Sequence, residues 1–177
     1  MKSYPALKSW TMMVFVLVLL GSMLGLSACG GGGDKPDANL ADLNKPVKVD
    51  IWQITLKGLP EKAKVIGSGG ISHEAENGTF VIIPAEVTNL GTDITLFPDD
   101  LLFLKDAQDR EWKLTSSTQQ FTYKQDHPEF DLLMDSPVNG GETRKTVLIF
   151  DAASDATGMY IVFHGYPDIL KIGYKTQ

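Results

Sequence analysis

Residue types that build common active sites are scarce in this chain of 177 residues. It has one cysteine, Cys29, so no disulfide can form within it. Its histidines lie far apart, without the close spacing that metal sites use: His73, His127 and His164. The sequence contains no Gly-x-Ser-x-Gly elbow, and no Gly-Lys-Ser/Thr follows the glycine tract 30–33. These absences predict a protein that is not an enzyme and has no catalytic residue, metal site or cofactor.

Positive charge is also in the minority. Without Lys2 and Lys8, the chain has 14 basic and 22 acidic residues, a net charge of −8. A nucleic-acid partner requires a basic face, because its phosphates have to be neutralised. The charge therefore argues against nucleic acid and is typical of a soluble exported domain.

One long apolar run contrasts with this polar background. No charged residue occurs between Ser9 and Ala28, and small residues precede Cys29. A basic start, an apolar middle and a small-residue end resemble a bacterial lipoprotein signal. The resemblance implies cleavage before Cys29, a covalent lipid on its thiol, and a location on the cell membrane or outer membrane, facing the periplasm or exterior. An uncleaved membrane helix is the alternative, since roughly 20 apolar residues span a bilayer.

Composition divides the chain into three parts. Residues 1–28 form the predicted lipoprotein signal peptide. Residues 29–46 comprise the lipidated cysteine and a linker that is rich in glycine and therefore flexible. Residues 47–177 form one folded domain, which is long enough to bury a core without disulfides.

Short runs of β-forming residues between turn sequences predict an all-β domain. The strongest is Thr79–Asn89, in which Pro84 indicates an edge strand or a bulge. From Val47 to Leu56 the apolar alternation shifts phase near Trp52, which predicts a bulge or a strand buried on both faces. Further strands are expected at 65–66, 94–97, 101–105, 110–114, 121–123, 143–150, 159–163 and 169–174.

Helical signals are limited to one segment. Asp126 as a cap and Pro128 in the first turn predict a short helix from Asp126 to Met134. Turns are expected at 106–109 and 137–142, and at Asn89 and Gly91, where a positive φ is anticipated. The pattern as a whole predicts an antiparallel β-sandwich of about seven to nine strands.

Three segments carry a family resemblance: 78–91, 102–112 and 139–151. They resemble the telokin-like, immunoglobulin-fold extracellular domains of bacterial lipoproteins, a family of unknown function related to a secreted mycobacterial immunoprotective antigen. The resemblance implies an immunoglobulin-like β-sandwich and a binding or scaffold role, and it carries no catalytic residues. The 106–109 turn lacks the glycine usual in this family's hairpin, and Pro84 is a second departure.

Two features are candidate ligand sites. The aspartates at 99, 100, 106 and 109 lack the alternating ligands of a calcium loop and are interpreted as turn formers. An aromatic and apolar stretch outside the clearest strands is either a loop folded over one end of the sandwich or an exposed partner site. We define this predicted interaction patch by Phe121, Tyr123, Phe130, Leu132, Leu133 and Met134.

The leading hypothesis is a lipid-anchored, extracytoplasmic binding module of the bacterial cell envelope that acts without catalysis. Its expected contacts are the membrane, through the lipid on Cys29, and an envelope or secreted protein. The alternative is an accessory lipoprotein that binds a small ligand or a metal. An envelope hydrolase is a third class, which would require a deep polar pocket with paired titratable groups.

Overall fold

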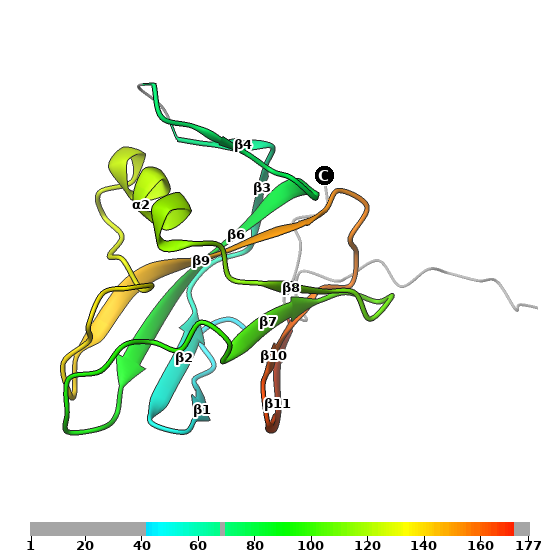
Figure 1. Ribbon diagram of the computed structural model, residues 1–177. Helices are drawn as coiled ribbons and strands as arrows, with labels where there is room; N and C mark the ends of the chain where they lie inside the picture. Colours follow the sequence, from blue (N-terminus) through cyan, green and yellow to red (C-terminus); the bar gives the residue numbers. More distant parts are fainter. Residues whose placement is uncertain (1–41, 68–69, 172–177) are drawn as a thin grey trace, which may run out of the picture. The chain divides into compact units, whose positions relative to one another are not determined.

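Antiparallel sheets form the part of the chain that this computed structural model describes, residues 42–67 and 70–171 (Figure 1). The first sheet contains β1 (Val47–Val49), β2 (Trp52–Leu56), β3 (Glu61–Ala63), β6 (Gly78–Asn89) and β9 (Thr143–Ala153). The second has the order β11 (Tyr166–Lys171), β10 (Tyr160–Phe163), β7 (Leu102–Lys105) and β8 (Glu111–Lys113). A hairpin of β4 (Val65–Ile66) and β5 (His73–Glu74) and the helix α2 (Ser117–Asp126) complete the described elements. The predicted antiparallel β-sandwich is confirmed.

Strand β6 occupies the interior of the first sheet. It pairs with β9 along one edge without a register shift, while β2 and β3 share its other edge. Pro84 lies between the last partner of β2 and the first partner of β3, and its carbonyl accepts a hydrogen bond from Lys57 N at 2.8 Å. The N–H and C=O of a strand residue point to the same side, so the missing N–H of Pro84 faces this gap. The prediction of an edge strand or a bulge at Pro84 is therefore wrong.

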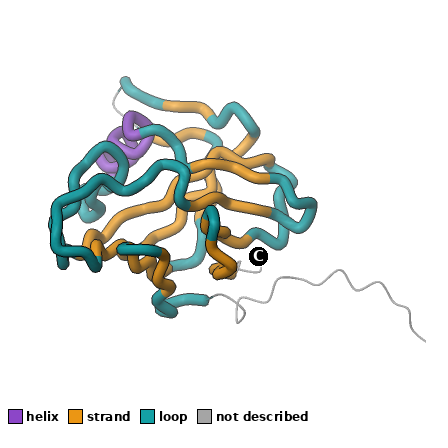
Figure 2. Tube along the Cα trace, turned by 60° about the horizontal axis from the view of Figure 1, so that its bottom comes forward, coloured by secondary structure: helices purple, strands orange, loops and turns teal. Residues whose placement is uncertain are grey.

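Both faces of β6 and β9 are buried. On the inner face, Val81 and Ile83 join the main core, which the second sheet covers with Leu102, Leu104 and Ile161. The outer face carries a second core, which includes Phe80, Ile82, Val147 and Ile149 together with Ile66 of β4 and Tyr123 of α2. Each large side chain buried in this way contributes roughly 1.5–3 kcal/mol. Helix α2 lies at the periphery of the strands, next to long loop segments (Figure 2).

The phase shift near Trp52 is a hairpin turn. Val49 pairs with Trp52, so Asp50 and Ile51 alone connect β1 to β2. Asp50 has a φ of 53°, a left-handed conformation that aspartate tolerates better than most residues. The predicted bulge is replaced by this tight turn, while β2 itself is buried at most positions.

The helix lies upstream of its predicted position. It spans Ser117–Asp126, so the strand expected at 121–123 is helical, and the helix expected from Asp126 to Met134 is wrong beyond its first residue. The segment 94–97 is also not a strand, although Thr95 forms a single β-bridge with Val138.

Asn89 is the anchor of the turn after β6. Its side chain is fully buried, and its Nδ2 donates to the carbonyls of Asp93 at 2.8 Å and Val138 at 3.0 Å. Its Oδ1 accepts from Gly91 N at 2.9 Å. Neither Asn89 nor Gly91 has the anticipated positive φ. The turn depends on the amide group of Asn89 rather than on a left-handed backbone.

The turn before β9 depends on glycine in two ways. A Cβ on Gly140 would lie 2.4 Å from the carbonyl carbon of Thr92, so the two loops approach too closely for any side chain there. Gly141 has a φ of +76°, which glycine adopts without strain.

Candidate functional site

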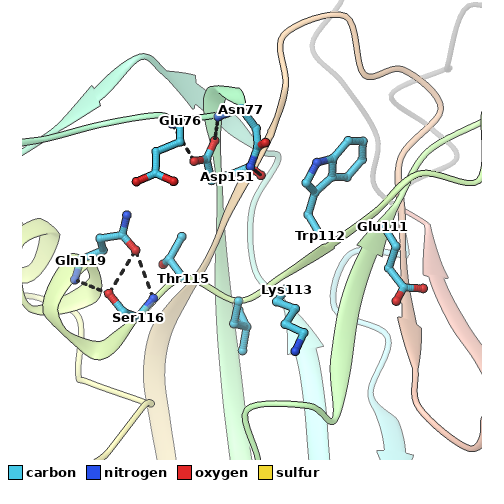
Figure 3. A pocket seen from close by; sticks show the side chains of 10 residues that line it. Glu76, Asn77, Glu111, Trp112, Lys113, Thr115, Ser116, Gln119 and Asp151 are labelled. Carbon is cyan, nitrogen blue, oxygen red and sulfur yellow. Dashed lines mark hydrogen bonds between the residues drawn. The ribbon is translucent and has the colours of Figure 1, made fainter.

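A polar cleft of about 430 Å³ lies where the chain leaves β8, passes β9 and enters α2 (Figure 3). Leu114 forms a β-bridge with Phe150 of β9, and Thr115 N donates to the carbonyl of Ile149 at 2.8 Å. The walls come from β8, the first turn of α2, the turn before β6 and Asp151 of β9. The volume falls in the range of small-molecule sites, roughly 300–1,000 Å³.

Asp151 organises one wall of this cleft. Its carboxylate oxygens accept the backbone N–H groups of Glu76 at 2.7 Å and Asn77 at 3.0 Å. Asn77 Nδ2 in turn donates to the Asp151 carbonyl at 3.2 Å. These bonds hold the turn before β6 against β9. The carboxylate of Glu76, on the exposed side of this turn, has no hydrogen bond or ion pair within the described chain.

The first turn of α2 forms the opposite wall. Ser116 is the N-cap, and its Oγ accepts from Gln119 N at 3.4 Å while Gln119 Oε1 accepts from Ser116 N at 3.1 Å (Figure 3). This reciprocal capping box satisfies donors that the start of a helix otherwise leaves free. The Nε2 group of Gln119 takes no part in it and is available to the cleft.

Thr115 lies between these walls and has an unusual hydroxyl. The residue is 6% exposed, and its carbonyl accepts from Gln120 Nε2 at 3.5 Å. Its Oγ1 is the one buried side-chain polar atom of the described residues that has no hydrogen-bond partner. An unpaired buried hydroxyl costs about 1–3 kcal/mol, so its retention calls for a reason.

A second cleft of about 550 Å³ adjoins the first. Both are lined by the four residues from Lys113 to Ser116, which form their common wall. The far side of the second cleft is built by Pro98, Asp99, Met134 and Asp135. The segment 113–116 therefore borders both clefts, with Lys113 and Ser116 exposed and with Leu114 and Thr115 buried.

Acidic side chains predominate along the two clefts. Lys113 is the single basic residue that lines them, against five acids: Glu76, Asp99, Glu111, Asp135 and Asp151. Glu111 is paired with Lys105 at 3.3 Å on the adjacent strand β7. The resulting negative potential opposes the approach of anions.

Trp112 stands at the rim beside Asn77 and Asp151 (Figure 3). The guanidinium of Arg110 lies 5.5 Å from its ring centroid, and Arg110 is itself fixed by ion pairs to Asp106 at 2.6 Å and Asp155 at 2.9 Å. Burial by itself would raise the pKa of the Asp106 carboxyl, but hydrogen bonds from Arg110 and Gln108 outweigh this and lower it. The hairpin that carries Trp112 is thus held by a buried, charged anchor.

The same β-sandwich occurs in solved bacterial proteins. The chain is similar to a conserved hypothetical protein from Bacillus anthracis, with 17% identity, 75% of this chain and 94% of that chain covered, and a TM-score of 0.55. It is similar to the YjhA protein from Bacillus subtilis, with 12% identity, coverage of 76% and 99%, and a TM-score of 0.50. An uncharacterized β-sandwich protein from Clostridium difficile overlaps less closely, at 17% identity, coverage of 76% and 91%, and a TM-score of 0.48.

No protein-family model and no curated protein matches the chain. At identities this low, the structural likeness shows a shared fold and nothing about a ligand. The β-sandwich part of the sequence resemblance is supported, whereas its telokin-like and lipoprotein parts stay predictions.

Burial separates the residues of the predicted interaction patch. Leu133 and Met134 belong to the main core and Tyr123 to the second core. Phe121 is 49% exposed on α2, and the remaining two are half-buried: Phe130 and Leu132. The six do not form one exposed apolar surface, and their contact with a partner stays a prediction.

Tyr123 illustrates the structural role of this stretch. Its ring stacks on His127 with 4.2 Å between centroids and packs near Phe130 in the second core. Burial, with smaller contributions from Glu61 and Glu129, raises the pKa of Tyr123 to about 12. The phenol therefore stays neutral throughout the physiological pH range.

The histidines contact different parts of the fold. His73 Nε2 lies 3.2 Å from the Thr122 hydroxyl on α2, His127 ends that helix, and His164 lies near Phe103 of the second sheet. Across residues 42–67 and 70–171, no three or more His, Cys, Asp or Glu residues are grouped so that they could hold a metal ion.

The aspartates of the 106–109 turn act as the sequence indicated. Asp106 Oδ1 accepts from Gln108 N at 2.9 Å and Arg110 N at 3.0 Å, and Asp109 adopts a φ of 59°. Aspartate suits both roles, because its short side chain bonds to nearby backbone N–H groups and it tolerates the left-handed region.

The predicted lipidation site Cys29, the signal peptide 1–28 and linker residues 29–41 lie outside the described residues. Residues 42–46, which the sequence assigns to the linker, already contact the domain: Asn44 N donates to Leu56 O at 2.9 Å, and Leu43 packs against the main core. None of the helices in the described residues is long and apolar enough to span a membrane.

Two residues of the second cleft were named from the sequence: Asp99 as a turn former and Met134 in the predicted interaction patch. The sequence analysis did not assign the other cleft residues to a site, although one signal for them exists. Ser116 and Gln119 have the spacing of a capping box, which would have placed the helix start at this point. No local pattern brings Asn77 and Asp151 to the same place, because they are 74 residues apart and meet only through β6 and β9 pairing.

Proposed function

We propose that this protein is a non-catalytic binding module of the bacterial cell envelope, anchored by a lipid on Cys29, with the cleft between β8, α2 and Asp151 as its binding site. The observation that carries the site is the buried, unpartnered hydroxyl of Thr115 in the wall between the two clefts. The lipoprotein-like sequence that ends at Cys29 supports the envelope location.

Binding rather than catalysis is supported by two of the five cleft carboxylates, Asp151 and Glu111, which are already engaged within the protein. Both oxygens of Asp151 accept backbone N–H groups, and Glu111 is paired with Lys105. A general acid or base has to reach a substrate proton, typically within about 2.6–3.2 Å. Carboxylates that already hold the fold in this way are poorly placed to transfer protons.

Site-specific photo-crosslinking in living cells tests the site. A benzophenone amino acid replaces Lys113 at the cleft or, as a matched control, the exposed Lys48 on β1, both in the full-length chain. We expect adducts with an envelope component from position 113 and few from position 48. Absence of adducts at 113, or equal yields at both positions, would refute the proposed site.

The anchor has its own test. Mass spectrometry of the protein purified from membranes should find the N-terminus at Cys29, carrying acyl chains. A Cys29→Ser variant should then be released into the soluble fraction, because the lipid is the tether. Native protein that retains residues 1–28 with an unmodified thiol contradicts the lipid anchor.

A further inference from the structure

We propose that the ligand is a neutral oligosaccharide that lies across the segment Lys113–Ser116 and occupies both clefts. This inference rests on the proposed function, because it names the ligand class of the same site. It is argued from the hydrogen-bonding groups, the charge, the open edge of β8 and the dimensions of the clefts.

Both donors and acceptors remain unpaired around the first cleft. Gln119 Nε2 donates, the Glu76 carboxylate accepts, and the Thr115 hydroxyl does both. A ~120° rotation about χ1 would move the Thr115 hydroxyl from its enclosed position to another staggered rotamer. A sugar hydroxyl, which also donates and accepts, matches this mixed set of groups better than a ligand with one kind of group.

The charge of the clefts selects against anionic ligands. Five carboxylates and one ammonium line them, so phosphates, nucleic acids and acidic glycans are repelled. A neutral glycan pays no such cost, and its hydroxyls can donate to the carboxylate of Glu76.

Strand β8 argues against an extended peptide as the ligand. It is the last strand of the second sheet, and its outer edge borders the first cleft. The strand has three residues and carries Glu111 and Lys113, and short, charged edge strands resist the addition of another strand. The recognition groups are therefore side chains, as expected for a sugar.

Trp112 contributes apolar surface at the rim. The half-buried indole packs in part against the main core. The rest of its surface can contact sugar C–H groups, and its N–H can donate to a hydroxyl. The Asp106–Arg110 pair and the Arg110 guanidinium near the ring hold it before any ligand arrives. Such preorganisation lowers the entropy that binding would otherwise cost.

The dimensions favour more than one sugar unit. The two clefts, of about 430 and 550 Å³, share residues 113–116 and extend from Asn77 on one side to Pro98 on the other. A chain of several sugar rings contacts both, whereas a single ring occupies one.

Tryptophan fluorescence provides the first measurement. Beyond Ala28 the tryptophans are Trp52, which is 2% exposed, and Trp112, which lines the cleft, so a ligand-induced change reports on Trp112. The lipidated protein in nanodiscs is titrated with maltotetraose, cellotetraose and the tetramer of N-acetylglucosamine. We expect a saturable change with at least one of them and none with inorganic phosphate.

Calorimetric titration of variants then locates the site. Thr115→Val and Trp112→Phe should each weaken binding of the responding tetrasaccharide at least tenfold. Thr118→Val, which makes the same change as Thr115→Val outside the clefts, should leave it unchanged. Circular dichroism checks that each variant is folded. If Thr115→Val does not fold, Trp112→Phe still tests the site, because it keeps an aromatic ring at this position.

Two results would overturn the inference. One is that none of the three neutral tetrasaccharides binds. The other is that binding survives both cleft substitutions. If sugars fail while crosslinking from position 113 persists, the cleft remains a binding site and only its ligand class is wrong.

Discussion

Asn89 and Thr115 are both buried polar residues, but they differ in whether their side chains form hydrogen bonds. The amide of Asn89 makes three hydrogen bonds that tie the loop after β6, at Gly91 and Asp93, to Val138 in the segment before β9. The hydroxyl of Thr115 makes none. The sequence predicted a turn at Asn89, because asparagine is typical of turns, but burial of its amide depends on Val138, 49 residues away. Nothing in the local sequence distinguished Thr115 from its hydroxyl-bearing neighbours.

Replacing Thr115 with valine should leave the protein as stable or more stable by about 1 kcal/mol, because an unpaired buried hydroxyl becomes a methyl group of the same shape. The matched control is Thr146→Val. Thr146 is equally buried, but its hydroxyl donates to the Asp131 carbonyl at 2.8 Å, so its loss should cost about 1–3 kcal/mol. Urea unfolding measures both, and a strongly destabilised Thr115→Val variant contradicts the account.

Among the elements, α2 shows how a local signal and a tertiary contact combine. Its capping box places the start at Ser116, and Tyr123 on its buried side joins the second core. The segment is rich in threonine, aromatic and glutamine residues, which leaves its helical period weak. Packing against β6 and β9 therefore decides that residues 121–123 are helical rather than extended.

Removing the cap should weaken this element selectively. Ser116→Ala is expected to cost about 1 kcal/mol, because the N–H of Gln119 loses its acceptor. Ser117→Ala, one position into the helix and outside the capping box, should have little effect. Thermal unfolding gives the stability, and hydrogen exchange of α2 amides shows whether the loss is confined to the helix. Equal effects of the two substitutions would argue against the capping role.

The strands were more predictable than the helix. Strands with β-branched runs, such as β6 and β9, end close to the predicted residues. Their signals, which are the run of β-forming residues and the turn residues that flank it, lie in neighbouring positions of the sequence. The prediction at Pro84 was wrong because an interior strand accepts a proline only where no partner needs its N–H. That place lies between the partners of β2 and β3, and only the assembled sheet defines it.

For the molecule as a whole, carboxylates paired in the fold set the acid limit of stability. The hydrogen bond from Arg144, with one from the Asn139 backbone, lowers the pKa of Glu142 to about 2. Hydrogen bonds from Arg110 also lower the pKa of Asp106. A carboxyl group whose pKa is lowered by folding stabilises the protein at pH values above its ordinary pKa. This stabilisation is lost as the pH falls through the pKa of the folded state. Stability should therefore decline between about pH 4.5 and pH 2.

Urea unfolding at pH 7, 4.5, 3.5 and 2.5 checks this decline. Glu142→Gln should flatten it, because the glutamine side chain does not titrate. Glu74→Gln is the control, since the Glu74 side chain has no hydrogen bond or ion pair within residues 42–67 and 70–171. A profile for Glu142→Gln that matches the wild type would show that the Arg144 contact does not govern the acid limit.

The sequence by itself determined the class of this domain. Runs of β-branched residues between turn residues commit the chain to antiparallel strands, because the two faces of a strand and its turns are set by neighbouring residues. The tertiary structure alone decided the candidate site. Glu76, Trp112, Thr115 and Asp151 become neighbours only when β6 pairs with β9 and the 113–116 segment passes between the sheets. Proximity of that kind depends on contacts between residues far apart in the chain, which local patterns do not encode.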